Sequence, residues 1–392
     1  MQIPPFSLDA QISDIKEEIE EALIRVFRSG KYIGGSEVAL FEEAFALEVQ
    51  TSYSVGCNSG TDALILALRA LNIGKDDEVI TSSFSFFATA EAISSVGARP
   101  VFVDIDPENY LMDLNLIEKV ITPKSKAILP VHLFGCPLDM DKLMEIAKKY
   151  NLKVVEDCAQ AAGANWRGKS VGSFGDVGCF SFFPTKNLGA AGDGGAITTN
   201  DFELAKNIKE LAIHGMPKRY LHTNIGYNSR LDSMQAAILN VKLTRLNKWI
   251  KQRQEIANNY IDKLSIIEAI KLPSKGLVSH VGHSWNQFVI RIIDNSFVKT
   301  NQGNSEVLAD SQNRDVFKNE LQKSGVNTII YYPIPIHLQP AYKELGYKVG
   351  SLPITEKICN QVISLPIFPE LGSTQQSYVI DTIKKIYNQP IN

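Results

Sequence analysis

A single lysine in an apolar, turn-rich segment is the residue of this chain best suited to covalent chemistry. Lys186 lies in the segment 181–190, where Pro184 ends the strand-like run 176–183 and a glycine-rich run, 189–195, follows. Proline interrupts a strand, and glycines allow the backbone to approach a ligand closely. A lysine shielded from water there has a lowered pKa and can bond to a carbonyl carbon. Because an isolated lysine at a strand end more often extends its charge into solvent, this interpretation depends on neighbouring motifs.

Two further motifs offer polar groups to a cofactor. Asp157 and Gln160 follow the apolar run 152–156. In an open parallel sheet, ligands lie beyond the carboxyl ends of the strands, where these side chains would point. A carboxylate there can hold a protonated ring nitrogen, which a pyridoxal cofactor needs. Gly60 and Thr61 begin a predicted helix after another strand-like run, and the free N–H groups of a helix start bind phosphate.

Taken in order, these motifs resemble those of the DegT/DnrJ/EryC1/StrS sugar aminotransferases, which are fold-type I enzymes that depend on pyridoxal 5′-phosphate. The likeness extends over nearly the whole chain. Each motif alone is a weak signal, and the ordered set is specific. The motifs are SGTDAL at 59–64, EDCAQ at 156–160, SFFPTK at 181–186, GDGG at 192–195 and GYNSRLD at 226–232.

The resemblance implies a set of cofactor-binding residues: Gly60, Thr61, Phe86, Asp157, Gln160, Ser181, Lys186 and Asn228. Lys186, the catalytic residue, would hold the cofactor and move protons between the donor carbon and the cofactor carbon. Asp157 would keep the ring nitrogen protonated, Gln160 would bond the ring oxygen, and Phe86 would stack on the ring. The others would hold the phosphate. Since Asn228 would reach the phosphate of the neighbouring subunit, a homodimer with shared active sites is expected.

The resemblance also implies the reaction. An amino group would pass from an amino acid, usually L-glutamate, to pyridoxal phosphate, which becomes pyridoxamine phosphate, and then to a keto group of a dTDP- or UDP-linked sugar. Branches that act at C-4 often carry His where this chain has Phe183, so the resemblance favours C-3. The candidate substrate contacts are Tyr32, Arg219, Tyr220, His222 and His337. An ordinary turn aromatic at Tyr32 and a solvated loop at 214–222 remain alternatives.

Other functions remain open at this point. A C-4 aminotransferase, or another pyridoxal-phosphate reaction such as side-chain cleavage of an amino acid, would use the same cofactor motifs. Some relatives were first regarded as regulators, which is a non-enzymatic function. Sugar dehydratases of the same fold carry histidine in place of the lysine, and Lys186 argues against that activity.

Composition narrows the class of protein. The chain has 392 residues, of which 44% are hydrophobic and 21% charged, and a net charge of −3. Such a charge predicts binding neither to nucleic acid nor to an anionic membrane. We find no secretory-signal pattern and no apolar run of membrane-spanning length, so a cytoplasmic protein is expected. The five cysteines lack metal-binding spacing, which predicts reduced core thiols and no structural metal.

The pattern of elements fits an α/β enzyme. Strands and helices alternate from 53 to 200, which predicts a mostly parallel sheet covered on both faces. Expected strands are 53–57, 78–82, 100–103, 126–132, 152–156, 176–182 and 195–199, with helices from about Gly60, Phe86, Asp113, Asp139 and Gln160. The resemblance implies the fold of aspartate aminotransferase, with a seven-stranded sheet.

Two domains are expected from the length and from the family. Residues 1–245 would hold the N-terminal segment and the large cofactor-binding domain, and 246–392 a smaller C-terminal α+β domain. The polar segment 295–314 is expected to be an exposed and mobile insertion. The segment 328–337 should return toward the cleft.

Overall fold

A seven-stranded sheet forms the centre of the larger region of the computed structural model, which describes residues 1–273, 281–293 and 306–388. The strand order is β1-β9-β8-β5-β4-β2-β3. Strand β9 is antiparallel to β1 and β8, and the other neighbours are parallel, so the prediction of a mostly parallel sheet is confirmed. The strands are β1 (Tyr53–Cys57), β2 (Glu78–Ser82), β3 (Arg99–Val103), β4 (Ser125–Leu129), β5 (Lys153–Asp157), β8 (Val177–Ser181) and β9 (Gly195–Thr199).

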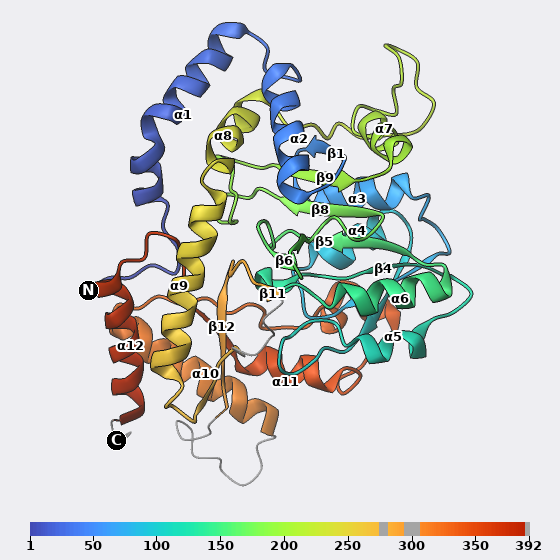
Figure 1. Ribbon diagram of the computed structural model, residues 1–392. Helices are drawn as coiled ribbons and strands as arrows, with labels where there is room; N and C mark the ends of the chain where they lie inside the picture. Colours follow the sequence, from blue (N-terminus) through green and yellow to red (C-terminus); the bar gives the residue numbers. More distant parts are fainter. Residues whose placement is uncertain (274–280, 294–305, 389–392) are drawn as a thin grey trace.

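Helices cover both faces of this sheet. Successive side chains of a strand point to opposite faces, and Ala127, Ile128 and Leu129 of β4 are all fully buried. Burial of both faces is typical of a parallel sheet between two helical layers. The connecting helices, seen at the right of Figure 1, are α3 (Gly60–Ala70), α4 (Ala88–Ser95), α5 (Leu114–Val120), α6 (Met140–Tyr150) and α7 (Phe202–Leu211).

The strand directions bring three polar groups to one edge of the sheet. Asp157 is the last residue of β5, and the parallel neighbour β8 ends at Ser181. Gly195, where β9 begins, pairs with both Ser181 and Cys57, the last residue of β1. Helix α3 then starts at Gly60. The carboxylate, the hydroxyl and the start of α3 therefore lie at the same edge, which is where open α/β sheets bind their ligands.

A second, smaller core surrounds an antiparallel sheet of β10 (Ile270–Lys271), β12 (Phe288–Ile292) and β13 (Val362–Leu365). The helices α9 (Leu246–Leu264), α10 (Glu306–Lys323) and α12 (Ser373–Asn388) lie around it at the lower left of Figure 1. Its fully buried side chains include Tyr260, Phe317 and Val379. The division between residues 245 and 246 stays a proposal, because Leu246 and Ile250 pack with side chains of the larger region. Ile3 packs in the smaller core, so the first residues of the chain associate with the C-terminal region.

Two sequence predictions differ from the structure. No helix begins at Gln160: residues 158–175 form turns and the short pair β6 (Asn165–Trp166) and β7 (Lys169–Ser170), because Gly163 and Gly168 adopt φ angles of 79° and 82°. These left-handed values end any helix and favour turns. Of the predicted insertion 295–314, residues 295–305 lie outside the described residues. The rest belongs to α10, where Asn313 and Arg314 are buried, so this part is not an exposed insertion.

The remaining elements surround the two cores. Among the described residues no helix has the length and apolarity needed to cross a membrane. All five cysteines are buried and unpaired, which confirms the prediction of core thiols.

The elements not yet named are α1 (Asp9–Ser29), α2 (Ser36–Val49), α8 (Ser233–Leu243), α11 (Pro353–Gln361), β11 (Val281–Gly282) and the 3-10 turns η1 (Leu133–Gly135), η2 (Ile336–Leu338) and η3 (Pro340–Leu345).

Candidate active site

A pocket of about 490 Å³ lies at the carboxyl edge of the large sheet. The smaller region contributes Gln287, Tyr331 and Tyr332 to its wall, so the segment 328–337 does return toward the cleft. All but one of the predicted cofactor residues line this pocket: Gly60, Thr61, Phe86, Asp157, Gln160, Ser181 and Lys186. Residues that are more than one hundred positions apart in the sequence therefore share one site.

Lys186 stands on a short turn that follows β8. Its backbone N–H donates to the carbonyl of Phe183, 2.8 Å away. Removal of its side chain from water lowers the pKa of the Lys186 amine to about 8, although the negative charge of Asp157 opposes this shift. A neutral amine is the nucleophilic form of lysine. The site thus makes Lys186 far more reactive near neutral pH than a lysine in solvent.

Helix α8 fixes the loop that follows the lysine. Lys242 Nζ donates to the carbonyl oxygen of Gly189 at 2.7 Å, and Gln235 Oε1 accepts from the Ala191 N–H at 2.8 Å. Neither Lys242 nor Gln235 is predicted from the sequence, since nothing in their spacing indicates which loop they contact. The loop that follows Lys186 is therefore hydrogen-bonded to a helix that lies about fifty residues further along the chain.

Asp157 lines the same pocket and is buried. Its Oδ1 accepts from the Ala159 N–H at 3.1 Å, and its Oδ2 accepts from the Thr89 hydroxyl at 2.8 Å. Burial raises the pKa of the carboxyl group, while these two donors and the charge of Lys186 oppose the shift. A carboxylate with two fixed donors retains free lone pairs for one further donor, such as a ring N–H.

The start of α3 provides the anion-binding end of the pocket. Ser59 caps the helix by accepting from the Asp62 N–H at 3.1 Å, which leaves the N–H groups of Gly60 and Thr61 without an intrahelical partner. A β-carbon on Gly60 would lie only 2.6 Å from Cβ of Ser181. The glycine is therefore required for the helix start and the Ser181 hydroxyl to converge on one small anion.

Gln160 and Tyr332 join the two regions across the pocket. Gln160 Oε1 accepts from the Phe134 N–H at 2.7 Å, and its Nε2 donates to the Tyr332 hydroxyl at 2.9 Å. One Nε2 hydrogen remains for a ligand oxygen. Phe86 is 59% exposed at the mouth of the pocket, and its ring centroid lies 6.2 Å from that of Tyr332. The sequence analysis did not identify Tyr332 as a pocket residue.

Several predicted site residues lie outside this pocket. Asn228 Oδ1 accepts from Arg230 at 2.6 Å, and neither residue lines the pocket of its own chain. Tyr32 donates to the Phe27 carbonyl at 3.2 Å. Arg219 and Tyr220 contact each other in an exposed loop. In the same loop, His222 Nδ1 lies 2.9 Å from the carbonyl oxygen of His214.

His337 does not line the pocket either. It is only 2% exposed, and both ring nitrogens form hydrogen bonds within the protein. Its backbone N–H donates to Ser83 Oγ at 3.0 Å, and burial lowers the pKa of the ring, so the neutral imidazole has one N–H, which the Glu356 carboxylate must accept from Nε2; Nδ1 then accepts from the Ser83 hydroxyl at 2.7 Å. Nε2 then carries a proton and donates to Glu356 at 3.1 Å. A direct contact between His337 and a substrate would require one of these bonds to break.

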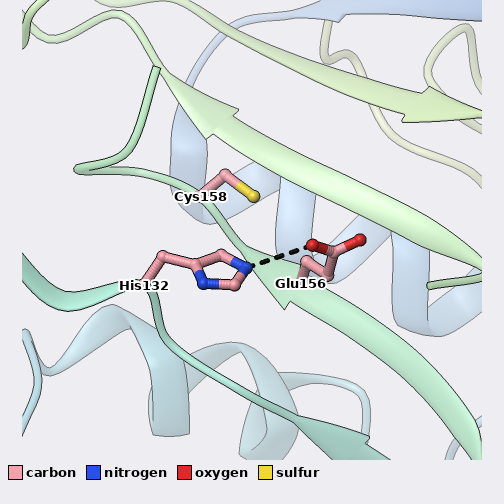
Figure 2. Close-up of side chains that lie close together, drawn as sticks. All are labelled: His132, Glu156 and Cys158. Atoms are coloured by element: carbon pink, nitrogen blue, oxygen red, sulfur yellow. Dashed lines mark hydrogen bonds and ion pairs between the residues drawn. The ribbon is translucent and has the colours of Figure 1, made fainter. Parts of the chain in front are cut away.

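His132, Glu156 and Cys158 form the only group of potential metal ligands found among the described residues (Figure 2). His132 Nδ1 accepts from the Leu138 N–H at 3.1 Å, so Nε2 carries the proton and donates to Glu156 at 3.1 Å. Three backbone N–H groups of the turn 172–175 also donate to the Glu156 carboxylate. Burial keeps Cys158 a thiol by raising its pKa. This donor set does not fit a metal ion, because its best ligand atoms are already bonded within the protein.

The comparisons with known proteins cover almost the whole chain. Residues 13–384 match the sequence model described as the DegT/DnrJ/EryC1/StrS aminotransferase family. The chain is 43% identical over 389 residues to a "pleiotropic regulatory protein" of Geobacillus stearothermophilus, covering 99% of each chain. It is 40% identical to a dTDP-3-amino-3,4,6-trideoxy-alpha-D-glucose transaminase of Streptomyces venezuelae, covering 98% of this chain and 96% of the relative. It is 42% identical to a UDP-N-acetyl-3-dehydro-alpha-D-glucosamine 3-aminotransferase of Acidithiobacillus ferrooxidans, covering 98% and 97%.

Solved structures of aminotransferases share the fold of this chain. DesV of S. venezuelae superposes with a TM-score of 0.92 at 40% identity, covering all of both chains. NtdA of Bacillus subtilis, which was solved with its cofactor PMP bound, has a TM-score of 0.88 at 33% identity. That match covers 99% of this chain and 86% of NtdA. The predicted fold type is therefore confirmed.

Proposed function

The chain belongs to the DegT/DnrJ/EryC1/StrS aminotransferase family, and on that premise we propose that it aminates the C-3 keto group of a nucleotide-linked sugar. It is an aminotransferase that depends on pyridoxal 5′-phosphate. The observation that carries the proposal is the pairing of Lys186, whose amine has a lowered pKa, with the buried Asp157 in one pocket. Removal of a proton from the carbon that bears the amino group requires a base, here Lys186, and a protonated cofactor ring, which Asp157 would hold.

The pocket residues fit the cofactor. The convergence of the α3 start on Ser181 suits a phosphate, and Asp157 has lone pairs for a protonated ring nitrogen. The remaining Gln160 hydrogen suits the ring oxygen, and Phe86 provides an aromatic face. When bound, the cofactor would supply an electron sink that stabilises negative charge at the donor carbon.

The protein residues would perform the proton transfers and the positioning. Lys186 Nζ would bond to the cofactor in the resting enzyme, and once displaced it would take a proton from the donor carbon and return one to the acceptor carbon. Asp157 would hold the positive charge on the ring nitrogen in place. The side chains of Phe86 and Tyr332 would limit the access of water to the reacting atoms.

We include a homodimer with shared sites in the proposal. Asn228 lies outside the pocket of its own chain, and the likeness of 226–232 to a family motif is what supports a role for it at the cofactor. Phe27, Tyr32 and Ile33 are exposed apolar side chains at the turn between α1 and α2. A partner that covers them would remove this apolar surface from water and bring a second Asn228 to the phosphate. Tyr32, Arg219, Tyr220 and His222 remain proposed contacts to the nucleotide sugar.

Phe183 and the names of two relatives support the choice of C-3. Phe183, half exposed at the pocket, occupies the position where C-4 branches often carry His. Of the two transaminase relatives described above, one is named for a 3-amino sugar and the other as the 3-aminotransferase of a 3-dehydro sugar. L-Glutamate is proposed as the donor and dTDP or UDP as the nucleotide. The five free thiols suit a reducing compartment, so we place the enzyme in the cytoplasm.

Product analysis tests this proposal. The purified enzyme, loaded with cofactor and L-glutamate, is incubated with matched 3-keto and 4-keto sugars linked to dTDP or UDP. Mass spectrometry should detect an amino sugar only with the 3-keto substrates. An amino sugar from the 4-keto substrates alone would assign the enzyme to C-4. The G. stearothermophilus relative is named as a regulatory protein, and the absence of an amino-sugar product with every keto sugar would favour a regulatory function.

A further inference from the structure

The environment of Asp157 contains two hydroxyl groups in series, and the proposed function assigns neither of them a role. Thr89, in the first turn of α4, donates to Asp157 Oδ2 at 2.8 Å. Ser85, in the loop between β2 and α4, lies 2.7 Å from the Thr89 oxygen. All three residues line the pocket, and each is at least nine-tenths buried.

The direction of both hydrogen bonds follows from the number of available protons. A threonine hydroxyl has one hydrogen, and Thr89 gives it to Asp157. The Ser85 hydroxyl must therefore be the donor in its contact with Thr89. Both O–H bonds point toward the carboxylate, so the negative charge on Asp157 is stabilised by a polarised chain of two donors.

We propose that Thr89, supported by Ser85, is a positioning residue that holds Asp157 ionised and aimed at the cofactor ring nitrogen. This inference rests on the proposed function, since it concerns how the chain receives the cofactor. Donation to a charged form favours that form, whereas burial alone favours a neutral carboxyl group. A neutral Asp157 would bind a protonated ring nitrogen poorly, because it would no longer carry the opposite charge.

The same hydrogen bonds hold the loop that carries Phe86 against Asp157. Phe86, proposed to stack on the ring, lies between Ser85 and Thr89 in the sequence. Ser85 and Thr89 tie this loop to Asp157 at the end of β5. The aromatic face and the carboxylate, which would contact the ring from different sides, are therefore held in one geometry. His337 anchors the same loop from its other end through Ser83.

The experiment uses cofactor binding rather than turnover. In the Lys186→Ala protein, pyridoxamine phosphate can bind without a covalent bond, so its Kd can be measured by calorimetry. The 1-deaza analogue, in which C–H replaces the ring nitrogen, serves as the matched probe because it has no charge for Asp157 to hold. Thr89→Val removes the donor at nearly constant shape, and Thr89→Ser keeps it.

We expect Thr89→Val to weaken binding of pyridoxamine phosphate about tenfold, as loss of a hydrogen bond to a charged group predicts, and to leave the Kd of the deaza probe within about twofold. Thr89→Ser should retain both affinities. An unchanged Kd for pyridoxamine phosphate in Thr89→Val, or an equal loss for both probes, would overturn the inference. The second result would mean that Thr89 only maintains the shape of the pocket.

Two further measurements keep the test decisive. If Thr89→Val does not fold, as thermal unfolding would show, Ser85→Ala removes only the outer donor and should weaken pyridoxamine phosphate binding about threefold, with no effect on the deaza probe. No effect on either probe would again overturn the inference. If the Lys186→Ala parent binds neither probe, the proposed cofactor site itself is wrong, which distinguishes that failure from a failure of Thr89 alone.

Discussion

Lys242 of α8 donates a hydrogen bond from Nζ to the carbonyl oxygen of Gly189, 2.7 Å away, in the loop that follows Lys186. Burial lowers the pKa of the Lys242 amine to about 8, although the charge of Glu370 opposes the shift. A largely buried charge at this place costs stability, and the bond to the carbonyl offsets part of that cost. The interaction therefore connects a helix of the scaffold to the position of the reactive lysine.

Lys242→Met should test this connection. The methionine keeps most of the side-chain volume but leaves the Gly189 carbonyl without its donor. We expect kcat to fall about tenfold. The free energy of unfolding should change by at most about 3 kcal/mol, the upper end of the usual cost of an unpaired buried carbonyl. Lys248→Met, at an exposed site on α9, is the control. Equal kcat values in the two variants would show that the loop does not need this anchor.

The lowered pKa of Lys186 predicts how cofactor capture depends on pH. Covalent capture requires the neutral amine, so the rate at which the apoenzyme binds pyridoxal phosphate covalently should rise with pH through a midpoint near 8. An ordinary lysine would give a midpoint near 10.4. Stopped-flow absorbance over this pH range measures the midpoint. A rate that still rises steeply above pH 9 would show that the site does not lower the pKa of this amine.

The same shift predicts how the stability of the apoenzyme depends on pH. Above pH 8 the folded protein has lost the Lys186 proton, whereas the unfolded chain keeps it until about pH 10.4. The unfolded state thus binds more protons in this window, and the contribution of Lys186 to the free energy of unfolding rises with pH. Lys186→Met should remove this rise when the two proteins are compared by chemical denaturation. Parallel curves for both proteins would contradict the prediction.

The sequence was sufficient to predict the sheet and the pocket residues that follow its strands. Lys186, Asp157 and Gln160 could be found because each lies directly after an apolar run, and the parallel arrangement then brings the strand ends together. Tyr332, Thr89 and Lys242 could not be found in this way, because their roles depend on contacts between distant segments. Local patterns do not specify which loop a buried side chain meets.

The helix expected at Gln160 was wrong for a local reason that the sequence did contain. Gly163, Gly168 and Gly172 recur every few residues and all adopt positive φ angles. Glycines at such spacing favour consecutive turns over a helix. Glu156 then holds this turn region by accepting three of its backbone N–H groups.

Asp157→Asn should separate the role of the carboxylate from that of the fold. Asparagine can still accept from the Thr89 hydroxyl, but it carries no charge for a protonated ring nitrogen. We expect kcat to fall at least about a hundredfold, consistent with loss of one preorganised charge, with unfolding temperature nearly unchanged. Asp381→Asn, at an exposed site on α12, controls for loss of a carboxylate elsewhere. A wild-type kcat for Asp157→Asn would remove this residue from the proposed mechanism.

Subunit mixing tests the shared site. Asn228→Ala and Lys186→Ala chains should each be nearly inactive alone. In a hybrid dimer one of the two sites combines an intact lysine with an intact asparagine. Random exchange of equal amounts should therefore restore about a quarter of wild-type activity, since about half of the dimers are hybrids and each has one intact site. Native mass spectrometry verifies the exchange, and proven exchange without recovered activity would exclude a shared site.

Absorbance measurements of the two half-reactions show whether Lys186 holds the cofactor and which keto sugar accepts the amine. The purified protein is mixed with pyridoxal phosphate, then with L-glutamate, and finally with a nucleotide-linked 3-keto or 4-keto sugar. Our account predicts a cofactor band that depends on Lys186, that converts to the aminated form with L-glutamate, and that returns only with the 3-keto sugar. A protein that binds no cofactor, or a glutamate-treated cofactor that no keto sugar returns to its first form, would contradict the account.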